Sequence, residues 1–296
     1  MDGNGAQSTM SGPMGLSQST AVLATMHQKE QAIAPILERE LGLTVTVTTD
    51  LNTDRFGTFT RDVPRMGTQL EAARRKAKAA LEETGAAVAI ASEGAFSPHP
   101  AVPLVACDRE IVMLIDADLG IEMVGEVLST ETNYRHASIR TVEEAQHFAE
   151  EVQFPSHRLV VMADSSVLDT NQMVKGIGTE AELVRAVESM LPSTSTGTVH
   201  IETDMRAMYN PTRMGVIAAA TEDLVRTIQL RCPACECPGF KVVERRSGLR
   251  CSLCHLPTEM IRLAIQRCQR CGHEETLLFP DGLKEADPAQ CWNCNP

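Results

Sequence analysis

Cysteines crowd the C-terminal fifth of this chain, where nine of the ten cysteines follow residue 231 in a sequence of 296 residues. Eight of them form four Cys-x-x-Cys pairs: Cys232 and Cys235, Cys251 and Cys254, Cys268 and Cys271, and Cys291 and Cys294. Each such turn directs two thiolates at one point, and two turns complete a tetrahedral Zn²⁺ site with bonds of about 2.3 Å. The spacings therefore predict a zinc-ribbon module over residues 231–296 with two structural sites.

We expect the cysteine pairs to combine in chain order, which gives C-x2-C-x15-C-x2-C and then C-x2-C-x19-C-x2-C. Both spacings are typical of zinc ribbons. The segment KVVERRSGLR inside the first site predicts a small hairpin with Ser-Gly as its turn. Four thiolates leave no open position for water, so a catalytic zinc is not expected. Cys237 is left over as a spare thiol or a competing ligand.

The charge of the chain is uneven. The net charge is −12, of which residues 231–296 contribute +1 and residues 1–230 contribute −13. Nucleic acids are bound by clustered Lys and Arg, so an acidic body argues against a nucleic-acid partner. No apolar run approaches the length of a membrane span, so no membrane association is expected either.

The first 18 residues are polar and lack the positive and apolar regions of a signal peptide, so we expect a disordered leader over residues 1–18. A cytoplasmic location follows as the default. There, clustered cysteines are more often metal ligands than disulfides. An α/β domain is expected over residues 19–230, followed by the zinc-ribbon module.

Apolar runs and amphipathic periods alternate along the body. The runs predict strands at 20–26, 43–48, 87–92, 110–116, 121–128, 158–163 and 197–202. The periods predict helices at 30–41, 69–83, 142–152, 180–191 and 221–229. This alternation indicates a mixed sheet flanked by helices.

Polar clusters follow four of these strands, at the places where ligands bind in such sheets. We expect them to share one pocket, in which carboxylates hold a cation and Lys or Arg holds phosphate. The candidates are His27 and Lys29; Asp54; Glu93 and His99; and Asp204, Arg206, Asn210 and Arg213.

Each cluster also has a purely structural interpretation. The Asp- and Pro-rich stretches fit turns chosen for their backbone shape. His27 and His99 fit ordinary hydrogen-bonded residues, and the Arg-Arg-Lys run at 74–76 fits a solvated helix face. Cys107 fits a buried thiol.

Several long motifs carry a resemblance to a bacterial family known as a domain of unknown function, number 6671. They are ATMHQKE, LNTDRFGTFTRDVPR, SEGAFSPHP, ETDMRAMYNPTRM and the CPxC…CxxC…CNP tail. The resemblance covers nearly the whole chain after residue 20, and it implies no activity.

The order of elements over residues 20–192 is similar to the inosine/xanthosine triphosphatase superfamily of nucleotide pyrophosphohydrolases. This similarity implies a phosphate-binding role for Lys29, a metal-binding role for Glu71, and a role for Glu93 as metal ligand or base. It also implies a contact of Lys175 with the nucleobase or phosphate. The first loop departs from that group, since it reads His-Gln-Lys-Glu instead of an Asn-centred pattern. The zinc tail is foreign to those enzymes, so likeness of fold is expected more than identity of chemistry.

These observations favour a hydrolase of a phosphorylated small molecule, such as a nucleoside triphosphate, that depends on Mg²⁺ or Mn²⁺. Glu71, Glu93 and Asp54 would hold the cation and activate water, while Lys29, Arg206 and Arg213 would neutralise phosphate. His27, His99, Asp204 and Asn210 would complete the pocket. The alternative is a non-catalytic anion-binding module that docks a protein partner through its zinc ribbons. Self-association as a homodimer stays open.

Overall fold

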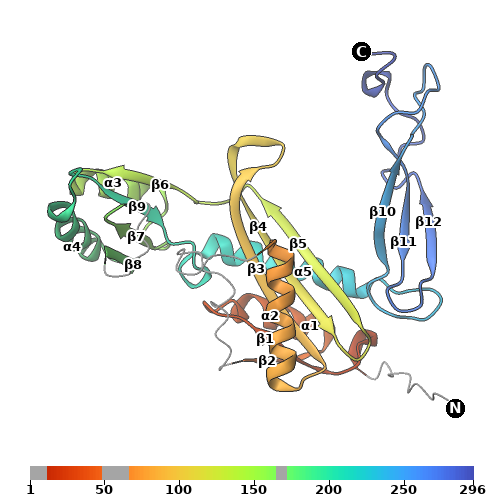
Figure 1. Cartoon of the computed structure of the whole chain (residues 1–296), viewed down its shortest axis with the longest axis horizontal. Helices are drawn as coiled ribbons and strands as arrows, with labels where there is room; N and C mark the ends of the chain where they lie inside the picture. The colour runs from red at the N-terminus through yellow and green to blue at the C-terminus, as the bar shows by residue number, and fades with distance from the viewer. Residues whose placement is uncertain (1–11, 49–66, 165–171) are drawn as a thin grey trace.

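The computed structural model describes residues 12–48, 67–164 and 172–296. Within these residues three sheets follow one another along the long axis of the molecule (Figure 1). A five-stranded sheet occupies the middle, a four-stranded sheet forms a small lobe at one end, and a three-stranded ribbon projects at the other end. The chain is an α/β protein with a mixed sheet, as the sequence predicts.

The central sheet has the strand order β2-β1-β3-β4-β5. β1 pairs in parallel with β2 and β3, whereas β3, β4 and β5 are antiparallel neighbours. The parallel strands need helical crossovers, and the antiparallel ones need only tight turns. The strands are β1 (Thr20–Ala24), β2 (Thr44–Val47), β3 (Val88–His99), β4 (Val102–Asp116) and β5 (Ile121–Ser129).

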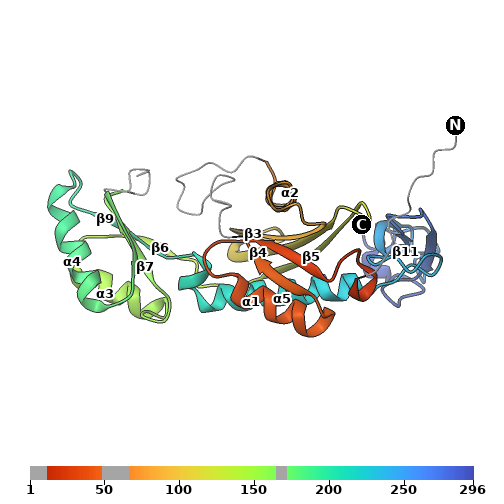
Figure 2. The ribbon, with the colours of Figure 1, turned by 90° about the horizontal axis from the view of Figure 1, so that it is seen from below.

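Helices cover both faces of this sheet (Figure 2). α1 (Glu30–Leu41) and α5 (Pro211–Gln229) pack on one face, and α2 (Gln69–Thr84) packs on the other. Successive side chains of a strand point to opposite faces, and this alternation decides which helix each residue meets. Ile90 and Val112 belong to the core beneath α1 and α5, whereas Ala91 and Ile111 belong to the core beneath α2.

Gly125 brings α5 into direct contact with β5. A Cβ at this position would lie 2.1 Å from the backbone nitrogen of Leu224 and 2.2 Å from the carbonyl oxygen of Ala220. Any side chain there would push the helix off the sheet. The contact fixes the position of α5, which carries Arg213 near its other end.

Residues 136–203 build a sheet of their own, which the sequence analysis did not anticipate. Its strands pair in the order β6-β9-β7-β8, and every pairing is antiparallel. The helices begin near the predicted positions, because Thr141 and Thr179 accept hydrogen bonds from the backbone of Glu144 and Glu182. The elements are β6 (His136–Ile139), α3 (Val142–Glu151), β7 (Leu159–Met162), β8 (Met173–Ile177), α4 (Glu180–Met190) and β9 (Val199–Thr203).

Three predicted boundaries were wrong. The stretch SEGAFSPHP is not a loop, since β3 continues through it in unbroken pairing with β4 to Pro98. α5 begins at Pro211 instead of residue 221, because Asn210 caps it and proline fits the first helical turn. Within the expected leader, Leu16 is fully buried in the core beneath α1 and α5.

The C-terminal ribbon is an antiparallel meander of β10 (Lys241–Ser247), β11 (Ile261–Arg267) and β12 (Glu274–Leu278). The predicted hairpin within KVVERRSGLR was wrong, because this segment is one strand whose partner is β11. Gln269 anchors the ribbon to the body: its side chain accepts a hydrogen bond from the Glu122 backbone nitrogen at 3.0 Å and donates one to the Glu122 carbonyl at 2.6 Å. In the described ranges, no helix has both the length and the apolar character needed to cross a bilayer.

Candidate functional site

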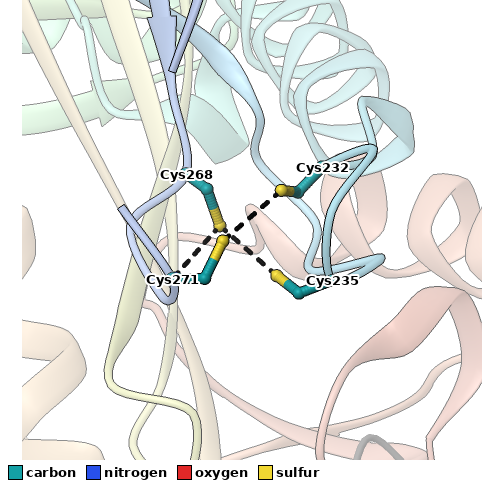
Figure 3. A group of neighbouring side chains, drawn as sticks. All are labelled: Cys232, Cys235, Cys268 and Cys271. Atoms are coloured by element: carbon teal, nitrogen blue, oxygen red, sulfur yellow. Dashed lines mark hydrogen bonds between the residues drawn. The ribbon is translucent and has the colours of Figure 1, made fainter. Parts of the chain in front are cut away.

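Two groups of four cysteines form the first candidate site. Cys232, Cys235, Cys268 and Cys271 point their sulfur atoms at a common centre (Figure 3). The Sγ atoms of Cys232 and Cys271 are 3.7 Å apart, as are those of Cys235 and Cys268. We call this group the proximal site, because it lies where the ribbon meets the body.

The distal site, at the far end of the ribbon, consists of Cys251, Cys254, Cys291 and Cys294. Its sulfur atoms are 3.8 Å apart between Cys251 and Cys294 and 3.6 Å apart between Cys254 and Cys291. A tetrahedron with Zn–S bonds of about 2.3 Å has edges of about 3.8 Å. Both groups therefore fit structural Zn²⁺.

The expected pairing of the cysteines in chain order was wrong. The first Cys-x-x-Cys pair joins the third, and the second joins the fourth. The strands between them explain this interleaving. β10 has seven residues and separates the first two pairs by about 20 Å, and antiparallel β11 then returns the chain to the first pair. The ligands alternate between the two ends of the ribbon.

The two sites have different surroundings. Cys232 and Cys268 are buried in the same core cluster as Met123 and Ile228 of the body. The proximal site therefore belongs to the body core as well as to the ribbon. At the distal end, Trp292 remains 64% exposed.

The second candidate site is a group of six buried charged side chains, which we call the charged cluster. It gathers residues from β3, β4, α5, α2 and the start of α1. A strand sheltered on both faces would normally be apolar, so charges at this depth require partners. The members are Lys29, Lys76, Glu93, Asp108, Glu110 and Arg213, each less than 9% exposed.

Glu110 holds the half of the cluster beneath α5. Arg213 Nε donates to Glu110 Oε1 at 2.7 Å, and Lys29 Nζ lies 3.7 Å from Glu110 Oε2. Lys29 also donates to Ser92 Oγ at 3.1 Å. A Cβ on Gly94 would lie 2.0 Å from Glu110 Oε1. Only glycine at this position leaves room for the carboxylate above β3.

Glu93 lies on the opposite face of β3, beneath α2. Its carboxylate is 2.5 Å from Lys76 Nζ. The side chain of Gln69 donates to the Glu93 carbonyl at 2.7 Å and so holds the start of α2 against β3. β1 pairs with β3 only as far as Ala91. The two halves of the cluster therefore meet beyond the carboxyl end of β1.

Two groups in the cluster have strongly shifted pKa values. The pKa of Lys29 is lowered to about 8, mainly by burial; the Glu110 carboxylate opposes this shift and the Arg213 charge adds to it. Burial also raises the pKa of Asp108 to about 8, reinforced by the negative charge of Glu110. A protonated Asp108 can share its proton with the Glu110 carboxylate. The cluster is therefore poised to gain or lose protons near pH 8.

We expect Asp108→Asn to flatten the pH dependence of stability between about pH 4 and 8. The folded chain binds the Asp108 proton more tightly than the unfolded chain, so this residue's contribution to stability falls as pH rises through that window. At pH 8.5 the free energy of unfolding of the variant should exceed that of the wild type by at least about 1 kcal/mol, because a pKa difference of one unit is worth about 1.4 kcal/mol. Urea unfolding at pH 5, 6.5 and 8.5 measures the effect. Parallel curves for the two proteins would contradict it.

Three predicted site residues have structural tasks. Glu71 is exposed and completes the capping box of α2, where its carboxylate accepts from the Thr68 backbone nitrogen at 2.7 Å. His99 Nδ1 accepts hydrogen bonds from Ala101 and Val102 in the β3–β4 turn. Asn210 caps α5 through the backbone nitrogen of Arg213. None of the three contributes a charge to the cluster.

Asp204 and Arg206 form an ion pair of 2.6 Å beside the small lobe. Arg213 connects that region to the cluster, since its Nη1 donates to the Met205 carbonyl. His27 takes a positive φ of 63° just before α1. Asp54 lies outside the described residues.

Sequence reasoning missed Lys76, Asp108 and Glu110. Lys76 was assigned to a solvated helix face, yet it is buried beside the alanines that face the sheet. Asp108 and Glu110 stand two residues apart on one face of a strand whose next residues are apolar. The sequence signal for Asp108 and Glu110 is the spacing of two acids on one strand face directly before an apolar run.

Of the comparisons with known proteins, only the comparison with protein families gives a match. Neither the curated proteins nor the solved structures contain a significant match to the chain. A family described as a domain of unknown function, DUF6671, matches residues 76–296. This match spans most of the chain and includes the four cysteine pairs. The chain therefore belongs to the DUF6671 family.

Proposed function

We propose that this protein is a divalent-metal-dependent hydrolase of a phosphorylated small molecule, and that the charged cluster is its reaction centre. Nucleoside triphosphates are the first candidate substrates. One observation carries the proposal: Lys29, Glu93 and Arg213, which are far apart in sequence, belong to one cluster beyond the carboxyl end of β1. Ligands of α/β sheets bind at such ends.

The chemistry of the cluster suits phosphate-ester hydrolysis. Glu93, Asp108 and Glu110 offer the oxygen ligands that Mg²⁺ or Mn²⁺ prefers. Buried Asp108 Oδ1 and Glu110 Oε2 accept no hydrogen bond from the described residues. Lys29 and Arg213 would stabilise the negative charge of the phosphoryl group, and a carboxylate would accept the proton of the attacking water.

The cation is expected to arrive with the substrate. In the described part of the chain, only the two cysteine groups bring three or more ligand atoms of His, Cys, Asp or Glu within 4.8 Å of one another. Mg²⁺ in phosphoryl-transfer sites is commonly held by one or two carboxylates together with substrate phosphates. The resemblance of the order of elements over residues 20–192 to the inosine/xanthosine triphosphatase superfamily supports the same proposal.

A nucleotide panel tests this function directly. The purified zinc-loaded chain is incubated with Mg²⁺ or Mn²⁺, and release of phosphate and of pyrophosphate is measured separately. Glu93→Gln should lower kcat at least about 100-fold, the usual range for loss of an acid–base or metal-binding group. Glu83→Gln, an exposed change on the same helix as Lys76, is the matched control and should leave turnover unchanged.

Absence of turnover with every nucleotide and both cations would remove the hydrolase proposal. Equal activity in Glu93→Gln and wild type would remove the charged cluster as its centre. Melting temperature and zinc content should be recorded for each variant, so that a folding defect is not mistaken for lost chemistry.

A non-catalytic anion-binding module is the second candidate. The ion pairs within the charged cluster favour this function. Lys29 and Arg213 already pair with Glu110, so the three groups neutralise one another instead of acting on a substrate. The exposed Leu253 and Trp292 at the distal site would then contact a protein partner. Nucleotides that raise the melting temperature without being hydrolysed would support this function.

The reduced thiols that both zinc sites need fit a cytoplasmic location, which we keep as part of the proposal.

A further inference from the structure

Two arginine side chains lie against one tyrosine ring beside the small lobe. The guanidinium carbon of Arg158 is 4.4 Å from the centroid of the Tyr209 ring, and that of Arg206 is 4.7 Å from it. Backbone hydrogen bonds fix the segments that carry them, because Arg158 N donates to the Tyr209 carbonyl and Asp204 N donates to the Arg158 carbonyl. The stack is therefore a built feature of the fold.

Two glycines of the KGIG motif make room for this stack. A Cβ on Gly176 would lie 3.1 Å from the Tyr209 ring and 3.4 Å from Arg206 Nη2. A Cβ on Gly178 would lie 3.2 Å from the guanidinium carbon of Arg158. Gly176 also has a φ of +73°, which favours glycine. The motif thus lets both guanidinium groups lie against the backbone at the end of β8.

The two arginines differ in their partners. Arg206 is neutralised by Asp204, which accepts from its Nε at 3.0 Å and from its Nη2 at 2.6 Å. Arg158 donates Nη1 to the Gly176 carbonyl at 3.0 Å. No carboxylate in the described ranges forms an ion pair with Arg158. Its guanidinium is partly buried, held in place, and retains donors for a further acceptor.

We propose that Arg158, stacked on Tyr209 and flanked by Arg206, is an oxyanion-binding site. A planar guanidinium with two N–H groups on one edge matches the oxygens of a phosphate or a carboxylate. Stacking on the ring and the bond to Gly176 hold the donors in place before binding, which reduces the ordering cost. Arg206 holds the other stacked position on Tyr209, and its ion pair with Asp204 leaves Arg158 as the charge that an anion would meet. This site shares no residue with the charged cluster, and anion binding there does not require hydrolysis.

Calorimetric titration of the intact zinc-loaded chain with pyrophosphate, and separately with malonate, tests the site without added Mg²⁺ or Mn²⁺. Arg158→Gln should weaken binding of the preferred anion about tenfold or more, since charged hydrogen bonds are lost. Arg158→Lys should be intermediate, because it keeps the charge but loses the fork. Arg185→Gln is the matched control: it removes the same charge from an exposed position on α4 and should bind as wild type does.

The outcomes separate the two anion classes and the two proposals. An Arg158-dependent affinity that is higher for pyrophosphate identifies a phosphate site, and one that is higher for malonate identifies a carboxylate site. Binding of neither anion by the wild type, or equal affinity in wild type and folded Arg158→Gln, would overturn the inference. Melting temperature and zinc content establish folding. Lack of nucleotide turnover would count against the proposed hydrolase alone.

Discussion

A chain that carries Cys232→Ser and Cys268→Ser together should retain one zinc ion, whereas one that carries Cys232→Ser and Cys251→Ser should retain none. The first pair of changes removes two ligands from the proximal site and leaves the distal site intact. The second removes one ligand from each site, and a structural zinc site depends on its full set of four thiolates. Zinc per chain, measured by mass spectrometry of the metal after extensive dialysis, distinguishes the two variants.

Pairing in chain order predicts the opposite result, with one ion kept by the Cys232/Cys251 variant. Cys237→Ser is the matched control, because Cys237 belongs to neither group of four, and this variant should keep both ions. The melting behaviour gives a second readout. Loss of the proximal ion should lower the unfolding temperature of the body, because Cys232 and Cys268 lie in its core. Loss of the distal ion should leave that temperature unchanged.

Arg213→Met should lower the free energy of unfolding by about 3–5 kcal/mol, which is the usual cost of leaving one partner of a buried ion pair alone. Both side chains of the Arg213–Glu110 pair are fully buried. The substitution keeps an unbranched apolar stem and removes the charge, so the buried Glu110 carboxylate loses its closest partner and, of the described cations, keeps only Lys29, at 3.7 Å. Urea unfolding followed by circular dichroism measures the change.

Arg226→Met supplies the control on the same helix. Its guanidinium is 63% exposed and pairs with Asp223, so its loss should change the free energy of unfolding by less than about 1 kcal/mol. The double variant Arg213→Met with Glu110→Gln should recover much of the stability, since it removes the buried charge from both sides. Equal losses in Arg213→Met and Arg226→Met would show that the buried pair does not carry the stability assigned to it.

The cysteines that can hold zinc were predictable from sequence because their chemistry is local. A Cys-x-x-Cys turn places its own two thiolates, so all eight ligand positions follow from spacing. Which turns share an ion depends on the path of the chain between them. That path is set by the pairing of β11 with both β10 and β12, and strand pairing over these distances leaves no mark in the cysteine spacing.

In the body as well, features set by neighbouring residues could be predicted and features set by distant contacts could not. Helix α1 was predicted with its observed bounds, and α3 and α4 were predicted near theirs, because apolar periods and Thr caps act within a few residues. The separate sheet of the small lobe was missed. β6 has only four residues and two of them are exposed, so its apolar pattern is too short to distinguish from a loop.

The charged cluster depends most on tertiary structure. Sequence reasoning selected Lys29, Glu93 and Arg213, but it also selected Glu71, which the capping box of α2 engages. It overlooked Lys76 and Glu110, whose burial is decided by the packing of α2 and α5 on opposite faces of β3 and β4. A charge is tolerated at such a depth only if a partner from another element meets it.

The sequence by itself determined the eight cysteines that can hold zinc, the α/β class and most of the helices of this protein. Each of these follows from residues that interact within one turn or one strand. Only the tertiary structure decided which cysteines share an ion, which charges are buried together, and which glycines lie beneath arginines. Those outcomes arise from contacts between elements far apart in the chain, where strand register and helix packing fix the distances.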